Sequence, residues 1–378
     1  MKSGLRILFI AKDAYGGHGG IAQYSRDMAE ALCEIPEVGE VVILPRVKRM
    51  STGLLPSKVT FKQEALGGKW HYFRAAVKSF RGGYDLVVCG HIRLLPMAVF
   101  AKWRLRAPMV LMVYGTDVWK PWDRLSKRLI SKVDLVWSIS RLTWERMKEW
   151  SHLPDHRMVL IPNTVKLSRY GMKPKNEALV SKYQLDGRRV LMTLARLPLN
   201  VRIKGIDEVL EVLPELVKDM PDLLYMVLGH GQDRFRLEAK AEALGVKDHV
   251  LFTGYIEEEL KADYLRLADA FVMPSRNEGF GFVFLEALAC GVPAVASVLD
   301  GGREALRNGQ LGELVDPGDP ESVKKGITAA LERAKGVPPG LSYFSWPVFS
   351  GLVKTAVGRA VGTMSENECL SDVVEIDS

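Results

Sequence analysis

Short apolar segments rich in β-branched residues recur along this 378-residue chain, and segments with helical periodicity lie between them. Each apolar segment predicts a buried strand. Strands that alternate with helices in this way build parallel sheets covered by helices on both faces. We expect strands at residues 5–11, 41–44, 86–89, 110–114, 135–139 and 159–161, and again at 190–195, 223–228, 250–253, 270–273, 294–297 and 312–315.

The pattern occurs twice, which predicts an α/β chain with two doubly wound domains, in keeping with about 150 residues per domain. We expect helices at 21–34, 141–150, 205–218, 234–244, 257–267, 283–289 and 320–334. A polar segment near residues 163–188 breaks the periodicity and marks the join. The expected parts are a domain at 1–165, a second at 166–342, a last helix at 343–362 and a flexible acidic tail at 363–378.

The composition excludes several classes of protein. Hydrophobic residues make up 47% and charged residues 26%, which excludes collagen-like, coiled-coil and wholly disordered chains. No run of 18 apolar residues exists, and the apolar core at residues 7–11 is too short for a signal peptide, so we expect a cytoplasmic protein. The four cysteines form no C-x-x-C pair, which predicts reduced thiols and no structural metal.

Positive charge is concentrated in the first half of the chain. Residues 1–165 hold 26 Lys and Arg against 14 Asp and Glu, whereas residues 166–378 hold 26 against 31. Between residues 45 and 82, nine basic residues accompany Trp70, Tyr72 and Phe73. Basic and aromatic residues together favour contact with an anionic membrane surface, which we expect at the cytoplasmic face of the membrane. The alternative is a solvated basic face.

The densest motif lies at residues 274–291, where a strand, a glycine-containing turn and an apolar helix follow one another. Backbone N–H groups at the start of that helix would be available to anions or sugar oxygens. Glu286 falls within the apolar helix, where a carboxylate needs hydrogen-bond partners. Hydroxyl groups of a ligand would serve, and neighbouring backbone or an arginine are the alternatives.

Further candidates follow other predicted strands. Arg196 and Lys204 flank the loop before the helix at 205–218, where their charge would suit an anion such as a diphosphate. Two glycine turns, at 229–231 and 16–20, permit close backbone approach by a ligand or form plain turns. His91 follows the strand at 86–89 and Asp117 the strand at 110–114, at the sheet edge where ligands bind.

Together these motifs resemble the retaining GT-B glycosyltransferases of the group 1 (family 4) type, whose two Rossmann-like domains face an interdomain cleft. Glu278 and Glu286 match the family's Glu-x7-Glu motif, Arg196 and Lys204 its phosphate pair, Gly16–Gly20 its glycine loop and residues 161–164 its interdomain signature. The resemblance implies transfer of a sugar from a nucleotide diphosphate sugar to an acceptor hydroxyl of a lipid-linked or polysaccharide precursor. It implies no cofactor and no metal.

The resemblance also implies roles for individual residues. Catalytic roles are expected for Glu278, His91, Arg196 and Lys204. Donor binding is expected to involve Gly17, Gly19, Gly20, Arg196, Lys204, Gly229, Gly231, Glu278, Gly279, Phe280, Gly281, Phe282, Val283 and Glu286. His18, Tyr114 and Asp117 are expected on the acceptor side, with Tyr114 standing where many relatives have histidine. A nucleotide-sugar epimerase of the same fold and a noncatalytic protein that binds nucleic acid or membranes stay open as alternatives, although we expect no nucleic-acid partner.

Overall fold

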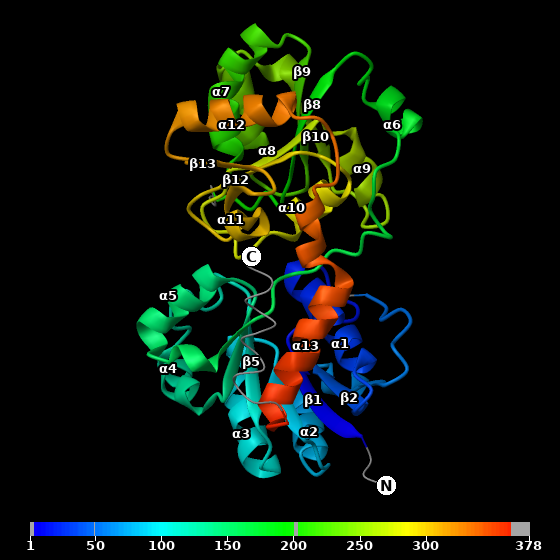
Figure 1. Ribbon diagram of the computed structural model, residues 1–378, viewed down its shortest axis with the longest axis vertical. Coiled ribbons are helices and arrows are strands. Elements are labelled where there is room, and N and C mark those ends of the chain that lie inside the picture. The colour runs from blue at the N-terminus through cyan, green and yellow to red at the C-terminus, as the bar shows by residue number, and fades with distance from the viewer. Residues whose placement is uncertain (1–3, 49, 200–202, 364–378) are drawn as a thin grey trace. The chain divides into compact units, whose positions relative to one another are not determined.

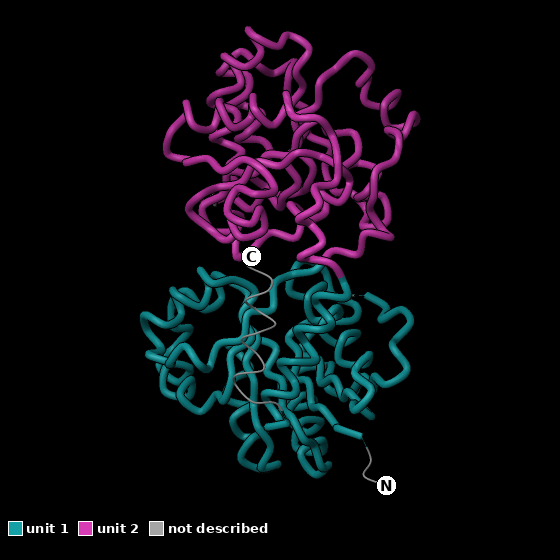
Figure 2. Tube along the Cα trace, viewed as in Figure 1, with its two compact units in different colours: residues 1–164, 346–378 teal, residues 165–345 magenta. Residues whose placement is uncertain are grey.

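The computed structural model describes residues 4–48, 50–199 and 203–363. The chain separates into two compact units, one formed by residues 1–164 with 346–378 and the other by residues 165–345 (Figure 2). We call them unit 1 and unit 2. The chain therefore leaves unit 1 after Thr164 and returns to it at Trp346. The tail expected at 363–378 lies, apart from Thr363, outside the described residues.

Unit 1 contains a seven-stranded sheet in the order β3-β2-β1-β4-β5-β6-β7, and all neighbouring strands pair in parallel (Figure 1). The strands are β1 (Leu5–Ala11), β2 (Val38–Pro45), β3 (Val59–Phe61), β4 (Leu86–Cys89), β5 (Met109–Val113), β6 (Leu135–Ser138) and β7 (Met158–Leu160). The helices are α1 (Gly20–Glu34), α2 (Lys69–Ser79), α3 (Leu95–Leu105), α4 (Arg124–Leu129), α5 (Arg141–Ser151) and α13 (Trp346–Val361).

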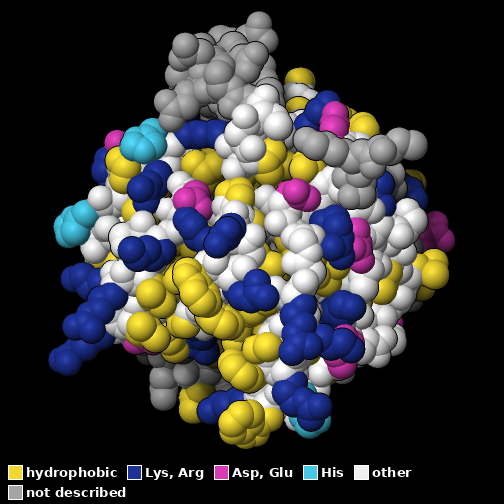
Figure 3. All heavy atoms as spheres, turned by 90° about the horizontal axis from the view of Figure 1, so that it is seen from below, with side chains coloured by type: hydrophobic (Ala, Val, Ile, Leu, Met, Phe, Trp, Pro, Cys, Tyr) yellow, Lys and Arg dark blue, Asp and Glu magenta, His cyan; other side chains and the backbone are white. Residues whose placement is uncertain are grey.

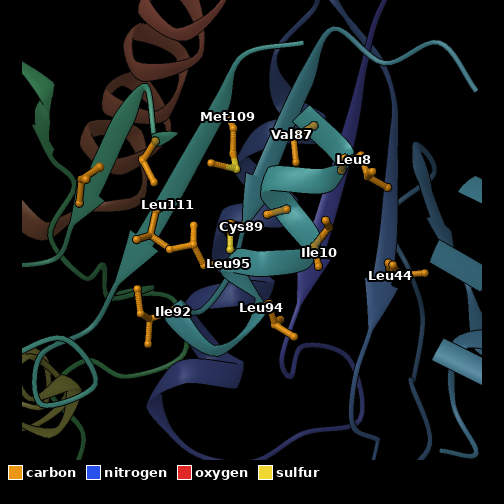
Figure 4. Packing of buried hydrophobic residues seen from close by; sticks show 14 of the residues in the cluster. Leu8, Ile10, Leu44, Val87, Cys89, Ile92, Leu94, Leu95, Met109 and Leu111 are labelled. Carbon is orange, nitrogen blue, oxygen red and sulfur yellow. The ribbon is translucent and has the colours of Figure 1, made fainter. Parts of the chain in front are cut away.

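The core of unit 1 forms because side chains two residues apart on a strand point to the same face of the sheet. Figure 4 shows three such pairs on neighbouring strands: Leu8 and Ile10 on β1, Val87 and Cys89 on β4, and Met109 and Leu111 on β5. Ile92, Leu94 and Leu95, which open α3 and the turn before it, cover these pairs from one side (Figure 4). The strands are thus buried by helices, as the apolar segments predict.

Helix α13 packs on α1 within unit 1, although more than 300 residues separate the two in sequence. The Phe349 ring meets the Tyr24 ring edge to face at 5.8 Å, and the Trp346 Nε1–H donates to Glu34 Oε1 at 2.8 Å. Tyr24 also donates its hydroxyl to the Ile161 carbonyl at 2.7 Å. The end of the chain therefore completes the packing of the first helix.

Unit 2 contains a six-stranded parallel sheet in the order β10-β9-β8-β11-β12-β13. The strands are β8 (Arg189–Leu194), β9 (Leu223–Leu228), β10 (Val250–Gly254), β11 (Ala270–Met273), β12 (Ala294–Ser297) and β13 (Glu313–Val315). The helices are α6 (Glu177–Lys182), α7 (Ile206–Asp219), α8 (Arg234–Ala243), α9 (Lys261–Leu267), α10 (Phe282–Ala289), α11 (Gly302–Ala305) and α12 (Pro320–Glu332).

The structure confirms the α/β class and the two doubly wound sheets. All twelve predicted strands are present, and strand β3 is an addition. Its three residues are only half-buried, so they lack the long apolar signal of the other strands. Helix α9 begins at Lys261 and not at residue 257. Within the described ranges, no helix is both long enough and apolar enough to cross a membrane.

Replacing Phe349 by alanine tests how far unit 1 depends on α13. The Phe349 side chain is buried, so we expect the Phe349→Ala change to lower the free energy of unfolding of unit 1 by about 3–5 kcal/mol. All eight tryptophans of the chain belong to unit 1, so urea denaturation followed by tryptophan fluorescence reports on this unit. Lys354→Ala, at an exposed position of the same helix, should change the free energy of unfolding of unit 1 by less than about 0.5 kcal/mol. Equal effects of the two changes would contradict this dependence.

Candidate active site

The strand order of unit 2 reverses between β8 and β11, which are neighbours in the sheet. In open α/β sheets, ligands bind beyond the carboxyl ends of the two strands at which the order reverses. Arg196 follows β8, and the loop that holds Glu278 follows β11. The topology therefore brings two predicted site segments, 82 residues apart in sequence, to one edge of the sheet.

Lys204 and Glu278 form an ion pair across this edge. The distance from Lys204 Nζ to Glu278 Oε2 is 2.5 Å, and both side chains are partly exposed. Arg196 and Lys204 line the same small pocket, together with Asp207 and Asp233. Lys204 directly precedes Gly205, the residue that caps α7, at the end of the loop after β8.

Asp300, which follows β12, organises the loop of Glu278. Its Oδ2 atom accepts hydrogen bonds from the Glu278 backbone N–H at 2.8 Å and from the Ser275 hydroxyl at 2.7 Å. Its Oδ1 atom accepts from the Gly302 N–H at 3.0 Å. Burial raises the pKa of Asp300 to about 6, although these three hydrogen bonds act in the opposite direction. Asp300 was not among the residues predicted from the sequence, although an acid beyond a strand end, directly before two glycines, was a usable signal.

The structure explains why residues 229 and 231 are glycines, a question that the sequence left open. A Cβ atom on Gly229 would lie 1.8 Å from the Ala195 carbonyl oxygen, and one on Gly231 would lie 1.8 Å from the Leu197 carbonyl oxygen. Leu197 also exchanges backbone hydrogen bonds with the second loop, donating to His230 at 3.1 Å and accepting from Asp233 at 3.1 Å. These glycines let the loops after β8 and β9 pack backbone against backbone.

Glu286 is a buried carboxylate on α10. Its Oε1 atom accepts from Lys261 Nζ at 2.6 Å and from the Tyr170 hydroxyl at 2.7 Å. The sequence suggested ligand hydroxyls, backbone or an arginine as partners, whereas a lysine from α9 and a tyrosine before α6 hold it here. Neither partner was singled out from the sequence, because both lie far from Glu286 along the chain.

The start of α10 places the other predicted donor-binding residues. Gly281 caps the helix with a φ of +92°, and its carbonyl accepts the Phe284 N–H at 3.2 Å. The N–H groups of Phe282 and Val283, which open the helix, have no acceptor within it. The Phe280 side chain points into the core, where its ring meets Phe344 at 5.5 Å. Gly279 lies against Gly301, since a Cβ on Gly301 would be 2.1 Å from the Gly279 carbonyl oxygen. Phe282 and Val283 form the first helical residues, so this segment offers its backbone to a ligand.

A second network of charged residues, which the sequence pattern did not indicate, lies beside the pocket that Arg196 and Lys204 line. Asp207 of α7 accepts from both terminal nitrogens of Arg236 at 2.7 Å and from Lys240 Nζ at 2.8 Å. Burial alone would raise the pKa of Asp207, but the hydrogen bonds from Arg236 and Lys240 outweigh burial and lower it to about 2. Asp233 also forms an ion pair with Arg236, with 2.6 Å between Asp233 Oδ2 and Arg236 Nη2. These bonds join α7 to α8 at the pocket that Arg196 and Lys204 also line.

In unit 1 the strand order reverses between β1 and β4, and Lys12 and His91 follow these strands. The distance between Lys12 Nζ and His91 Nε2 is 3.4 Å. His91 is buried, and its Nδ1 atom accepts from the Arg93 backbone N–H at 3.1 Å. Burial first, then the charges of Lys12 and Arg93, lower the pKa of His91 to about 3.

The remaining predicted residues of unit 1 have separate roles in the structure. The Tyr114 hydroxyl donates to the Gly90 carbonyl at 3.0 Å, and the Tyr114 N–H donates to Asp117 Oδ1 at 3.1 Å. Asp117 lies in a turn after β5. His18 is exposed.

The glycine loop of unit 1 leads into α1. A Cβ on Gly17 would collide with the Asp13 carboxylate, 1.7 Å from Oδ1. Gly19 caps α1 with a φ of +85°, and Gly20 is the first residue of the helix. Packing and backbone conformation therefore require glycine at positions 17 and 19, whatever the loop binds.

The chemistry available in unit 2 is electrostatic. Arg196 and Lys204 supply positive charge, and the first turn of α10 supplies backbone donors, so the site suits an anion joined to a hydroxyl-bearing group. Among the described residues, no three His, Cys, Asp or Glu side chains are arranged to hold a metal ion.

Two family models match most of the chain between them. "Glycosyl transferases group 1" matches residues 176–336, and "Glycosyltransferase Family 4" matches residues 18–169. The chain is 33% identical over 308 residues to a GDP-mannose-dependent alpha-(1-6)-phosphatidylinositol monomannoside mannosyltransferase from Mycolicibacterium smegmatis, covering 76% of this chain and 79% of the relative. It is 32% identical over 375 residues to a D-inositol 3-phosphate glycosyltransferase from Geodermatophilus obscurus, covering 89% and 83%.

Solved structures share the fold. A structure of HepE from Anabaena in complex with UDP-glucose superposes with a TM-score of 0.73 at 18% identity, covering 94% of this chain and all of that one. A sucrose-phosphate synthase from Thermosynechococcus elongatus gives a TM-score of 0.73 at 19% identity, covering 95% and 100%. Both similarities show the two-sheet GT-B fold.

Asp300 predicts a pH dependence of stability in unit 2. Its folded-state pKa of about 6 lies above the unfolded value of about 3.9, so its contribution is complete below the unfolded value and is lost as pH rises through 6. Relative to Asp300→Asn, the wild type should lose stability on the order of 2–3 kcal/mol between pH 4 and pH 7. Unit 2 contains no tryptophan, so its unfolding transition changes the far-UV circular dichroism but not the tryptophan fluorescence. Urea denaturation followed by circular dichroism in that transition measures the stability difference between the two proteins.

The matched control is Asp248→Asn, at an exposed position of unit 2. Its stability difference from the wild type should stay constant within about 0.5 kcal/mol over the same pH range. A difference between wild type and Asp300→Asn that does not change between pH 4 and pH 7 would refute the role given to the buried carboxyl group.

Proposed function

The chain belongs to the group 1 glycosyltransferases and is a nucleotide-sugar-dependent hexosyltransferase of this retaining family, and we propose that its acceptor is a phosphatidylinositol-type lipid. The name of one relative specifies a phosphatidylinositol monomannoside, which supports this acceptor, and the name of the other, D-inositol 3-phosphate, supports the phosphorylated inositol but names no lipid. We further propose GDP-mannose as the donor, after the name of the first of these relatives.

The observation that carries the proposal is the position of Arg196 and Lys204 at the reversal point of the unit 2 sheet. Both line one pocket, and Lys204 is held at 2.5 Å from Glu278. When the bond between sugar and diphosphate breaks, negative charge develops on the leaving diphosphate. Two positive groups already in place stabilise that charge without reorganising, which lowers the barrier to transfer.

The neighbouring residues complete a donor site in this proposal. The N–H groups of Gly281, Phe282 and Val283 at the start of α10 donate to the donor's oxygens. Glu278 binds hydroxyls of the sugar, and Glu286 binds those of the ribose, with Lys261 and Tyr170 holding the Glu286 carboxylate in position through their hydrogen bonds. Gly229 and Gly231 act by holding the loop after β8 in place.

We propose that the reaction needs no metal ion. Arg196, Lys204 and the α10 backbone together offer the charge and donors that a divalent cation would otherwise supply to a diphosphate. Addition of a chelator should therefore leave the rate of transfer unchanged.

We also propose that unit 1 contacts an anionic membrane at the cytoplasmic face, through α2 and α3. Trp70 and Trp103 are 79% and 71% exposed, and Phe73 and Phe100 are also exposed. The Phe100 ring stacks on Trp103 at 5.9 Å and meets Phe80, at the end of α2, at 5.7 Å. The exposed Phe100 of α3 thus packs on the buried Phe80 at the end of α2, which links the two helices.

Basic residues surround these aromatic side chains. Six exposed ones lie on or next to the two helices: Lys69, Arg74, Lys78, Arg81, Arg104 and Arg106. Figure 3 shows one end of unit 1, on which hydrophobic side chains gather with Lys and Arg on either side. Each basic residue near an anionic surface contributes about 1 kcal/mol, so this surface favours anionic vesicles over neutral ones.

Lys204→Ala tests the donor site. We expect kcat/KM for transfer from GDP-mannose to phosphatidylinositol to fall on the order of 10²- to 10³-fold, because one preorganised charge is lost. Transfer is measured with radiolabelled donor and product analysis, and far-UV circular dichroism checks the fold. Lys247→Ala, an exposed and equally charged position, should retain the wild-type value. A fall of less than threefold for Lys204→Ala would overturn the assignment.

Trp70→Ser combined with Trp103→Ser tests the membrane surface. The double variant should bind vesicles that contain anionic lipid at least tenfold more weakly than wild type in a sedimentation assay, since two interfacial aromatic anchors are lost. Binding of the wild type should weaken as salt rises. Phe235→Ser removes a similarly exposed aromatic side chain from unit 2 and should bind as wild type. Equal binding to neutral and anionic vesicles would rule out the proposed surface.

A further inference from the structure

The backbone of Glu278 is held on both sides by the segment that follows β12. Its N–H donates to Asp300 Oδ2 at 2.8 Å, and its carbonyl accepts the Gly301 N–H at 2.9 Å. A Cβ atom on Gly301 would lie 2.1 Å from the Gly279 carbonyl oxygen, so the two segments are in direct backbone contact. Residues 300 and 301 therefore fix the point from which the Glu278 side chain extends to Lys204.

The Asp300 carboxyl group is fully buried and faces hydrogen-bond donors. Besides the Glu278 N–H, the Ser275 hydroxyl donates to it at 2.7 Å and the Gly302 N–H at 3.0 Å. An ionised carboxylate only accepts hydrogen bonds, and bonds to a charged acceptor are about twice as strong as neutral ones. Protonation of Asp300 would remove the charge and weaken its bond to the Glu278 backbone.

We infer that Asp300 is a positioning residue for sugar transfer, which as a carboxylate holds the Glu278 backbone so that the Glu278 side chain meets the donor sugar beside Lys204. Asp300 contacts neither donor nor acceptor in this assignment and acts through Glu278. The inference rests on the proposed role of Glu278 in binding hydroxyls of the sugar.

The environment of Asp300 makes this role depend on pH. Burial, with a smaller contribution from the charge of Glu278, raises the pKa of Asp300 to about 6 against the effect of its three hydrogen bonds. The charged side chains on the adjoining segments are those of Lys204, Arg276, Glu278, Arg303 and Glu304. As pH falls through about 6, transfer should slow, whereas the contribution of Asp300 to stability should rise, because the neutral form is easier to bury.

Two variants and a control test the assignment in the full chain. Asp300→Asn keeps the size of the side chain but carries no charge and replaces one acceptor oxygen by a donor. Ser275→Ala removes one hydrogen bond to the carboxylate and leaves the bond from the Glu278 N–H in place. Asp248→Asn, at an exposed position of unit 2, is the matched control. The kcat for transfer from GDP-mannose to phosphatidylinositol is measured between pH 5 and pH 8.

We expect the wild-type kcat to fall about tenfold between pH 7 and pH 5, with an apparent pKa near 6. Asp300→Asn should have a kcat at least about tenfold lower at pH 7.5 and should lack this decline. Ser275→Ala should keep the decline but shift it upward by about one pH unit, since the lost hydrogen bond favours the ionised form. Asp248→Asn should follow the wild type.

The comparison between variants isolates Asp300 from other titrating groups. Burial raises the pKa of Asp117 in unit 1 to about 7, but Asp117 is present in all four proteins, so it cannot cause a difference between them. An acid decline in Asp300→Asn equal to that of the wild type would overturn the inference. If Lys204→Ala still reduces transfer in that case, the proposed function stands and the positioning role alone fails.

Amide hydrogen–deuterium exchange decides the inference without any substrate. At pH 7.5 the peptide that contains residues 275–281 should exchange at least about tenfold faster in Asp300→Asn than in the wild type or Asp248→Asn, because the Glu278 N–H has lost its charged acceptor. Equal exchange in the three proteins would overturn the positioning role. Absence of transfer by every protein would instead overturn the proposed donor or acceptor, and the exchange result would still decide the role of Asp300.

Discussion

Backbone packed directly against backbone, at the carboxyl edge of the unit 2 sheet, is the constraint on which the candidate active site depends. A Cβ would lie 1.8 Å from a carbonyl oxygen at Gly229, 2.1 Å at Gly301 and 2.5 Å at Gly205. Only glycine allows these approaches, so the loops after four strands form one layer. That layer fixes where Arg196 and Glu278 leave the sheet, so the backbone that carries the charges of the pocket is in place before any ligand binds.

The sequence was sufficient for the fold because the information is local. An apolar segment such as 223–228 predicts its own strand, and the alternation with helices predicts parallel sheets. Strand β3 was missed because three half-buried residues carry no such signal. Gly229 and Gly231 were candidates from the sequence, but the reason that glycine is needed there could not be predicted. It lies in the close approach of carbonyl groups from a different loop.

The pairs that build the sites could not be predicted from local pattern. Lys12 and His91 are 79 residues apart, and Lys204 and Glu278 are 74 apart, so each pair exists only because the strand order reverses between their two strands. The Glu-x7-Glu motif indicated Glu286 but not Lys261 or Tyr170, which hold its carboxylate. Residue types therefore indicated candidates, whereas topology determined which of them meet.

The return of the chain to unit 1 at Trp346 has a consequence for synthesis on the ribosome. Residues 165–345 form one continuous segment, and the Val165 N–H donates to the Phe344 carbonyl at 2.9 Å, which joins the two ends of that segment. Unit 1 begins first but lacks α13, and with it the contact of Phe349 with Tyr24, until residues 346–361 have been synthesised. Unit 2 can therefore complete its fold before unit 1 does. Until α13 has been synthesised, α1 of the nascent unit 1 stays partly uncovered.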